Sequence, residues 1–423
     1  MKKLLVLGTG SNIGNLEVVE YAKTQGIHTI VTDYNPPEKS PVKLIADEYW
    51  MISTADIDAL EKKCREENIS GIYGGTDYAQ DIVLELTERL GLPCYCSKGS
   101  WHYSRDKLAF KKKCEEYGVP TAKRFHISTP IKEEELDAIE FPVVVKPTDR
   151  SGNLGFSYCY DKKDFVVAYT KALEMSESGV VVVEKLLTGH EYGAFYVLAD
   201  GEIRLLNLWA MLSQDGMPGN CYSMSTTVID CLDKYLKEVN PQVLNLLKGI
   251  GCRDGVAWIE FMTDADGNFY ALEVGQRLSG EMLWIPLHTV RNFDSVAWMV
   301  NYAVNGYNDV TQLPDTQEDY LKKCACGYIL WSKEAGVVTE ITGDDVIKAT
   351  PGMSIHSVVG KGEYTDRYRY CSIVTFAAED CEDMCEKIAY VNKTLQMVNE
   401  HGNDMLIYYN QYNHLREVYR RGR

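Results

Sequence analysis

Two glutamates in one short stretch are well suited to hold a metal ion. Glu260 and Glu273 lie within GVAWIEFMTDADGNFYALEVGQR, which covers residues 255–277. If residues 265–268 form a four-residue hairpin loop, Glu260 lies opposite Glu273 on the neighbouring strand. Like charges in that position repel, and a divalent cation would reverse the sign of the interaction. Magnesium prefers one or two carboxylates plus phosphate oxygens, so the stretch predicts a metal–phosphate site.

An arginine follows the second of these acids. Strand alternation places Glu273, Gly275 and Arg277 on one face, and a guanidinium can bind a phosphate or a carboxylate with two parallel hydrogen bonds. The alternative is an exposed hairpin that carries two acids by chance. The apolar neighbours of the acids, which include Trp258 and Phe261, argue against exposure.

A lysine ends an apolar run and is followed by a polar, glycine-containing loop. Residues 141–155 read FPVVVKPTDRSGNLG. Backbone N–H groups of such a loop can surround phosphate oxygens while Lys146 supplies a point charge. Ser151, Gly152 and Gly155 are the candidate loop contacts. The alternative is a surface hairpin with an incidental lysine.

A second apolar strand runs directly into charged residues. Residues 180–191 read VVVVEKLLTGHE. Adenine can be bound at such an edge, because a carboxylate accepts from its exocyclic amine and backbone groups add further bonds. The alternative is a strand that ends in solvent. The candidate contacts are Glu184, Lys185, Leu186 and Leu187.

Residues 1–100 alternate between apolar strands and helices, which predicts a doubly wound parallel sheet. Strands are expected at the N-terminus and over 27–31 and 69–73, with helices over 16–25, 57–67 and 78–90. A glycine loop, GTGSNIG, follows the first strand, and Asp33 ends the second. This pattern misses the G-x-G-x-x-G dinucleotide fingerprint by one residue. A dehydrogenase therefore remains only an alternative.

The remaining residues mix strands and helices. A helix over 104–117 ends at Gly-Val-Pro, and residues beyond about 315 are strand-rich, with helices near 380–400 and at the end. The other expected elements are strands over 142–146, 156–160 and 180–186, helices over 163–176 and 282–305, and hairpins that pair 191–198 with 203–211 and 256–262 with 269–274.

Composition narrows the class of protein. A chain of 423 residues predicts two or three domains. The net charge of −17 argues against nucleic-acid binding. No window reaches the ~18 consecutive apolar residues of a membrane span. Thirteen cysteines are scattered without metal-binding spacing, which indicates reduced, buried thiols and a cytoplasmic location.

In their order along the chain, these motifs resemble the ATP-grasp superfamily, which includes biotin carboxylase, carbamoyl phosphate synthetase, purine-pathway ligases and L-amino acid ligases. The resemblance implies an α/β and α+β fold in three parts. Residues 1–103 would form a Rossmann-like pre-ATP-grasp domain, and residues 104–314 the ATP-grasp domain with a mobile lid over about 121–187. Residues 315–423 would form a small, strand-rich α+β domain.

The resemblance also implies roles. Lys107, in SRDK, and Lys146 would contact nucleotide phosphates, and the segment from Glu184 to Leu187 would bind adenine. Glu191 would meet the ribose. Glu260 and Glu273 would hold one or two Mg²⁺ ions, for which Mn²⁺ can substitute. Arg277 would steady an acyl phosphate.

Two residues depart from the commoner family pattern. Gly275 stands where many relatives have a metal-binding asparagine, so a second metal ion is in doubt, and water is the expected substitute ligand. Glu281 stands where many relatives have glycine, although biotin carboxylase has a glutamate base at a similar offset. The alternative for Glu281 is an acid at a helix N-terminus, favoured by the helix dipole.

The expected function is an ATP-dependent carboxylate–amine ligase that forms an acyl phosphate and releases ADP and phosphate. The alternatives are a biotin-carboxylase-like or purine-pathway carboxylase and a non-catalytic ATP-binding protein. The expected partners are small-molecule carboxylate and amine substrates, without nucleic acid or membrane, and a homodimer remains open. The candidate substrate-pocket walls are residues 74–78, Trp209, Met211, Tyr222, Trp284 and His288.

Overall fold

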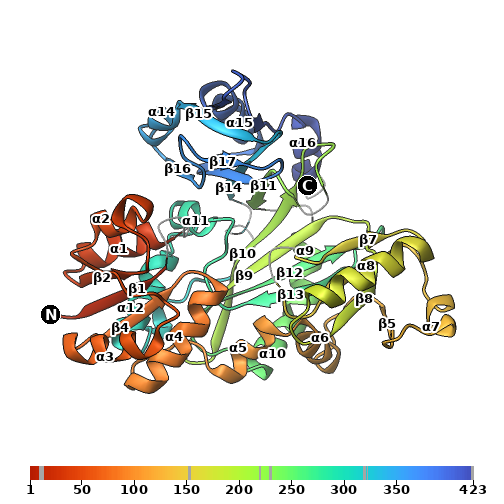
Figure 1. Cartoon of the computed structure of the whole chain (residues 1–423), viewed down its shortest axis with the longest axis horizontal. Helices are drawn as coiled ribbons and strands as arrows, with labels where there is room; N and C mark the ends of the chain where they lie inside the picture. The colour runs from red at the N-terminus through yellow and green to blue at the C-terminus, as the bar shows by residue number, and fades with distance from the viewer. Residues whose placement is uncertain are drawn as a thin grey trace.

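The computed structural model describes residues 1–8, 14–150, 154–218, 221–227, 231–317, 321 and 323–420. The N-terminal sheet and its helices lie on one side of the molecule, and the C-terminal region lies above the centre (Figure 1). A long central sheet joins them to a smaller sheet on the opposite side, which carries α8 (Lys162–Met175).

The N-terminal sheet confirms the predicted parallel architecture. It has four strands in the order β3-β2-β1-β4, all parallel. The prediction missed β3 and α2, since each is too short to show a period. The strands are β1 (Lys3–Leu7), β2 (His28–Thr32), β3 (Glu48–Trp50) and β4 (Gly71–Gly74), and the helices are α1 (Asn15–Thr24), η1 (Pro37–Lys39), α2 (Val42–Ile45), α3 (Ile57–Glu67) and α4 (Asp77–Leu90).

The single helix predicted over 104–117 is two helices. Its main part is α6 (Lys107–Glu116), whereas residues 104 and 105 end a separate helix, α5 (Lys98–Arg105), which was not predicted. Asp106 separates them and accepts hydrogen bonds from the backbone N–H groups of Leu108 and Ala109, both at 2.9 Å. This carboxylate caps α6 and places Lys107 in the first helical turn.

The smaller sheet is built from residues within the segment predicted as a lid (about 121–187), and the role of a lid stays a prediction. Its strand order is β5-β8-β6-β7, and α8 packs on one face through Phe165, Ala168 and Ala172. The predicted strands and helix are confirmed to within two residues. The elements are β5 (Arg124–Phe125), α7 (Glu133–Asp137), β6 (Val143–Pro147), β7 (Ser157–Cys159) and β8 (Val181–Lys185).

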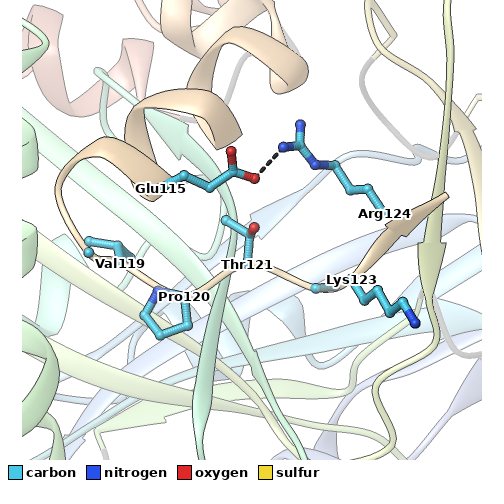
Figure 2. A pocket seen from close by; sticks show the side chains of 8 residues that line it. Glu115, Val119, Pro120, Thr121, Lys123 and Arg124 are labelled. Atoms are coloured by element: carbon cyan, nitrogen blue, oxygen red, sulfur yellow. Dashed lines mark hydrogen bonds and ion pairs between the residues drawn. The ribbon is translucent and has the colours of Figure 1, made fainter. Parts of the chain in front are cut away.

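An extended linker joins α6 to this smaller sheet. Figure 2 shows the hollow along it, where Glu115 of α6 forms an ion pair with Arg124 of β5. The backbone N–H of Ala271 donates to the Pro120 carbonyl at 2.8 Å. The linker is therefore fixed to the central sheet, and none of the predicted site residues lines this hollow.

The central sheet carries both predicted hairpins. Among the described residues it has nine strands, in the order β13-β12-β9-β10-β11-β14-β18-β16, with β20 also paired to β14. The strands before residue 315 are β9 (Glu191–Ala199), β10 (Glu202–Leu212), β11 (Met224–Thr227), β12 (Gly255–Thr263) and β13 (Phe269–Gly275). Those after it are β14 (Cys324–Ser332), β16 (Met353–Ser357), β18 (Tyr370–Ala378) and β20 (Leu406–Ile407).

The pairing of β11 with β14 carries this sheet across the expected boundary at residue 314. The division into three domains therefore stays a prediction. The remaining central helices are α9 (Leu232–Lys234), the π-helical turn η2 (Tyr235–Val239), α10 (Asn240–Gly249) and η3 (Val310–Gln312).

The helix predicted over 282–305 is also two helices. α11 (Trp284–Arg291) ends at Asn292, which adopts a left-handed conformation with φ of 51°. α12 (Ser295–Asn305) begins after Asp294, whose side chain accepts from the Ala297 N–H at 2.9 Å. A left-handed residue stops the first helix and a capping acid starts the second.

The C-terminal region is rich in strands, as predicted. A three-stranded sheet, in the order β17-β15-β19, stands beside the central one. Ten of the thirteen free cysteines are buried, as expected for small apolar residues. No described helix is long and apolar enough to cross a membrane. The elements are β15 (Gly336–Thr342), α14 (Asp344–Lys348), β17 (Tyr364–Thr365), α15 (Cys381–Thr394), β19 (Gln396–Asn399) and α16 (Tyr412–Arg420).

Candidate active site

The two glutamates of the predicted metal site face each other across the β12–β13 hairpin. Glu260 pairs with Glu273 in the strand register, as predicted. The predicted loop is wrong by one residue, since Thr263 pairs with Phe269 and leaves residues 264–268 in the loop. A bulge between Glu260 and Phe261 compensates for the longer loop and restores the predicted pair.

The carboxylates around Glu260 repel one another. Burial raises the pKa of Glu260 well above its ordinary value, and Glu273, Glu191 and Glu281 add to the rise. Burial, with Glu273 and Glu281, also raises the pKa of Glu191 to about 7. An excess of buried negative charge is what a cation would relieve.

Lys107 lies against the second glutamate. Its Nζ is 3.0 Å from Glu273 Oε2 and donates to the Arg150 carbonyl at 3.1 Å. Burial alone would raise the pKa of Glu273, but the ammonium groups of Lys107 and Lys146 together outweigh burial and hold that pKa below its ordinary value. Glu273 is therefore a carboxylate at neutral pH.

Lys146 and Glu184 also come together. Lys146 Nζ lies 3.2 Å from Glu184 Oε2, and Lys111 Nζ lies 2.7 Å from Glu184 Oε1. Burial would raise the pKa of Glu184, but the two lysines outweigh burial and lower it. Glu184 is therefore a carboxylate that lies between the ammonium groups of Lys111 and Lys146.

The sequence analysis missed Lys111. Its side chain is fully buried, and its Nζ also donates to the Ala271 carbonyl at 3.3 Å. Lys107, Lys111 and Cys114 recur at the spacing of one helix face, a signal that could have identified it. Lys112 and Lys113 on either side of that face obscured the pattern.

The predicted adenine-binding segment at the end of β8, residues 184–187, is hydrogen-bonded to the loop before β6. Lys185 Nζ donates to the Glu140 and Phe141 carbonyls, both at 3.0 Å. The backbone N–H of Leu186 donates to the Pro142 carbonyl at 3.0 Å. Leu187 is half-buried beside them. The Lys185 ammonium thus binds backbone carbonyls rather than a predicted site residue.

Of the predicted phosphate loop, Ser151 and Gly152 lie outside the described residues. Gly155 is described and has a φ of +77°. A Cβ at this position would lie 2.7 Å from Pro147 Cγ. Both the backbone conformation and the close approach require glycine.

Arg277 forms a two-point ion pair with Asp77 of α4. Its Nε lies 2.5 Å from Asp77 Oδ1, and its Nη2 lies 3.3 Å from Oδ2. The guanidinium also stacks on Trp258, at 5.3 Å from the ring centroid. Asp77 was predicted only as part of a candidate pocket wall (residues 74–78), and its ion pair with Arg277 was not predicted.

Glu281 is buried next to Tyr222, whose hydroxyl donates to Glu281 Oε1 at 2.8 Å. α11 begins only at Trp284. The alternative of an acid in the first turn of a helix is therefore wrong for Glu281. Its carboxylate contributes to the rise of the Glu260 pKa, which places it near the metal-site pair.

The space beside Gly275 is filled by an indole ring. A Cβ at this position would lie 2.1 Å from Trp258 Cζ2. The ring of Trp258 thus occupies the place where the Cβ of a larger residue would lie. The expectation that water replaces an asparagine as a metal ligand stays a prediction.

The predicted substrate walls separate into two groups. Trp209 and Met211 belong to the hydrophobic core, and His288 is exposed. Tyr222 and Trp284 lie closer to the site, since Tyr222 contacts Glu281 and the indole of Trp284 donates to the Ser279 carbonyl at 2.9 Å. Trp284 also belongs to the same hydrophobic core as Trp209 and Met211, whereas Tyr222 bonds directly to a charged residue of the site.

Asp33, the acid of the candidate dinucleotide site, is already bound by residues of the N-terminal region. Lys43 Nζ lies 3.1 Å from Asp33 Oδ1, and the Ser40 hydroxyl donates to Oδ2 at 2.7 Å. The Asn35 N–H donates to Oδ1 at 2.6 Å. Residues 9–13 of the glycine loop lie outside the described residues. Asp33 thus forms a buried, structural ion pair with Lys43.

A small pocket lies beside part of this cluster, next to Asp77, Lys107 and Glu273. The acids and cations come from α4, the α5–α6 junction, the smaller sheet and β12–β13. The pocket is lined by Asp77, Ser104, Arg105, Lys107, Asp149, Arg150, Trp258, Glu273, Val274 and Gly275.

Comparison with known proteins identifies the central part of the chain. Residues 139–284 match the family described as ATP-grasp domain. The N-terminal section of the carbamoyl phosphate synthase large chain from Aquifex aeolicus is 26% identical over 303 residues, which are 66% of this chain and 54% of that protein. The chain thus spans about half the length of this relative.

Solved structures match nearly the whole chain. An L-amino acid ligase from Bacillus licheniformis superposes with a TM-score of 0.78 at 16% identity, over 95% of this chain and 99% of that one. The biotin carboxylase domain of 2-oxoglutarate carboxylase from Hydrogenobacter thermophilus superposes with a TM-score of 0.76 at 18% identity, over 96% and 91%. Residues 139–284 therefore match an ATP-grasp domain, and the chain has the fold of these two solved structures.

Proposed function

We propose that the protein is an ATP-dependent carboxylate–amine ligase that activates its carboxylate substrate as an acyl phosphate. The observation that carries the proposal is the opposed pair Glu260 and Glu273, with Lys107 3.0 Å from Glu273. Two facing carboxylates destabilise a hairpin unless a cation joins them. A lysine at the same point supplies the positive charge that a phosphate requires.

The metal proposed for this pair is Mg²⁺, for which Mn²⁺ could substitute. The donor oxygens of Glu260 and Glu273 fit a hard cation. Among the described residues no cluster of three His, Cys, Asp or Glu side chains forms a complete site, and phosphate oxygens of ATP would supply further ligands. Such an ion, when bound, would neutralise charge on the phosphates. With Trp258 packed on Gly275, one ion is better supported than two.

The nucleotide would lie between the smaller sheet and the central hairpin. Lys107 and Lys146 would contact its phosphates, and Glu184 would accept from the adenine amine. Leu186 and Glu191 would complete the base and ribose contacts. Lys185, Leu187, Ser151, Gly152 and Gly155 stay in the proposal as predicted contacts.

In the first chemical step, a carboxylate oxygen of the substrate attacks the γ-phosphorus of ATP. The new O–P bond forms as the bond to the β-phosphate oxygen breaks, and ADP leaves. Lys107 and Lys146 spread the charge on the transferring group. Arg277 would hold the carboxylate in line, because a guanidinium matches a carboxylate with two parallel hydrogen bonds.

In the second step, an amine nitrogen attacks the acyl carbon and inorganic phosphate leaves. The amine must lose a proton, and Glu281 is the buried carboxylate proposed to take it. Tyr222, 2.8 Å from Glu281 Oε1, would hold that carboxylate in place. A base within hydrogen-bond reach is the requirement for such a transfer.

Similar proteins differ in their second substrate, so bicarbonate must be tested. One solved neighbour is an L-amino acid ligase, and another is a biotin carboxylase domain described as a dimer with MgADP and bicarbonate. The proposed partners are a small carboxylate and an amine, and a homodimer is included by analogy with that dimer. We propose a cytoplasmic location, because reduced thiols persist in a reducing compartment.

The proposal is tested by measuring ADP release with amino acids and small carboxylates in pairs, with and without bicarbonate. Glu273→Gln should lower turnover about 100-fold or more, because it removes a charge that acts on the phosphoryl group. Asp266→Asn, in the exposed loop of the same hairpin, is the matched control and should keep full turnover. Near-normal turnover in Glu273→Gln, or dependence on bicarbonate without an amine, would contradict the proposal.

A further inference from the structure

The arginine proposed to hold the substrate carboxylate already holds an internal one. Asp77 is the first residue of α4, and its two oxygens meet Arg277 at 2.5 and 3.3 Å. The side chains of Arg277 and Asp77 are only 18% and 24% exposed. Asp77 thus occupies the Nε–Nη2 edge of the guanidinium, and a substrate carboxylate that binds this edge with two hydrogen bonds must displace it.

The other cations near Asp77 have carboxylate partners of their own. Lys107 lies 3.0 Å from Glu273, and Arg105 Nε lies 3.5 Å from Asp81 Oδ2. Both lower the pKa of Asp77, though less than Arg277 does, and together the three outweigh burial. Asp77 is therefore a carboxylate whose direct partner is Arg277.

Displacement has a cost that depends on the substrate. A plain carboxylate, or bicarbonate, would take Arg277 and leave the half-buried charge of Asp77 without a partner. An uncompensated charge of this kind is costly, and its cost appears as lost affinity. A substrate that carries an ammonium next to its carboxylate would supply a new partner to each member of the pair.

We propose that Asp77, paired with Arg277 beside the pocket, selects an α-amino acid as the acyl donor. This inference rests on the proposed ligase function and names its substrate class. The carboxylate of the amino acid takes Arg277, and its ammonium takes Asp77. The ion pair between Arg277 and Asp77 is thereby replaced by two ion pairs with the substrate. A carboxylic acid without the amino group leaves Asp77 without a partner.

The surrounding charges favour the same class. Besides Asp77, the carboxylates of Glu281 and Glu273 also interact electrostatically with Arg277. An ammonium entering this region meets an excess of carboxylates, while a second negative charge on the donor would be repelled. Dicarboxylates and bicarbonate are thus disfavoured relative to a zwitterion.

The test compares acyl donors that differ only in the amino group. The pairs are L-alanine with propanoate, L-leucine with 4-methylpentanoate and L-phenylalanine with 3-phenylpropanoate. Hydroxylamine serves as the common nucleophile, because it converts any acyl phosphate to a hydroxamate with release of phosphate. The ratio of kcat/KM for hydroxamate formation within a pair should be about 100 or more in the wild-type protein.

In the Asp77→Asn variant the ratio of kcat/KM between the amino acid and its deaminated analogue should fall at least about tenfold, because the amide no longer supplies the negative charge that the ammonium requires. Asp77→Glu should retain most of the preference. Glu88→Gln removes an exposed acid of the same helix, which pairs with Lys98, and should leave the ratio unchanged.

Several results would overturn the inference. If Asp77 only positions Arg277, both donors of a pair lose rate equally in Asp77→Asn and the ratio stays constant. Equal use of amino and deaminated acids by the wild-type protein would exclude selection by Asp77 even if the variant does not fold, while leaving the ligase function intact. Hydroxamate from no donor would contradict the ligase function, and the inference with it.

Discussion

Each cation that is assigned to binding a phosphate or a carboxylate forms an ion pair with a carboxylate of the protein. Lys107 pairs with Glu273, Lys146 with Glu184, and Arg277 with Asp77. Each cation that the proposed mechanism assigns to a substrate is thereby held in place by a carboxylate. Binding would exchange partners rather than create buried charge, which limits the desolvation cost.

Glu191 offers a test of the electrostatics. Its pKa is raised from 4.5 to about 7 by burial and by Glu273 and Glu281. A raised carboxyl pKa contributes stability that is complete below pH 4.5 and is lost as the pH rises through about 7. The Glu191→Gln variant should therefore gain unfolding free energy relative to wild type at pH 8, by about 1–2 kcal/mol after solvent screening, and much less at pH 4.5.

Urea denaturation at the two pH values measures this difference without added metal or nucleotide. Glu174→Gln, which removes an exposed acid of α8, is the control and should show no comparable change with pH. An equal effect of Glu191→Gln at both pH values would show that Glu191 does not carry the raised pKa.

At the scale of elements, two tryptophans pack on glycines across the central sheet. Trp209 pairs with Gly193 and Trp258 with Gly275 in the strand registers. A Cβ at Gly193 would lie 2.0 Å from the Trp209 ring. These glycines leave room for large rings on neighbouring strands, and the Trp258 ring in turn supports Arg277.

The Gly275→Ala variant should therefore lose stability, by about 1–3 kcal/mol, because the indole of Trp258 must move. The loss is read from thermal or urea unfolding, and ligase turnover should fall with it as Arg277 loses its stacking partner. Gly280→Ala is the matched control, because a Cβ there meets nothing within 4 Å. Equal stability of the two variants would refute the packing explanation.

The sequence predicted most elements because their apolar periods are strong. The parallel N-terminal sheet, both hairpins and the partner of Glu260 followed from local patterns. The breaks at Asp106 and Asn292 were missed, since neither residue is glycine or proline. The hairpin partner was right although the loop was one residue longer, because a bulge compensated.

Within the site, what the sequence could not predict was the pairing of distant residues. Arg277 and Asp77 are separated by 200 positions, so no local pattern joins them. Lys111 lay within a run of three lysines, and although its helix spacing marks a buried face, nothing in the sequence indicated Glu184 as its partner. Such contacts depend on how α4, α6 and the sheets pack together.

At the scale of the whole molecule, the site draws on three sheets. Asp77 follows the last strand of the N-terminal sheet, Lys146 and Glu184 belong to the smaller sheet, and Glu260 and Glu273 belong to the central hairpin. The pocket is lined by residues of α4, of the α5–α6 junction, of the segment after β6 and of the β12–β13 hairpin. Figure 1 shows how the three sheets are arranged. The arrangement places a proposed carboxylate site next to a proposed phosphate site, as acyl phosphate formation requires.

The most direct test of that central claim follows oxygen from substrate to phosphate. An acyl donor labelled with ¹⁸O in its carboxylate is incubated with ATP, Mg²⁺ and an amine, and the products are analysed by mass spectrometry. Acyl phosphate formation predicts that one ¹⁸O atom appears in inorganic phosphate at each turnover, with none in ADP. Label in AMP, or phosphate release without label, would contradict the mechanism.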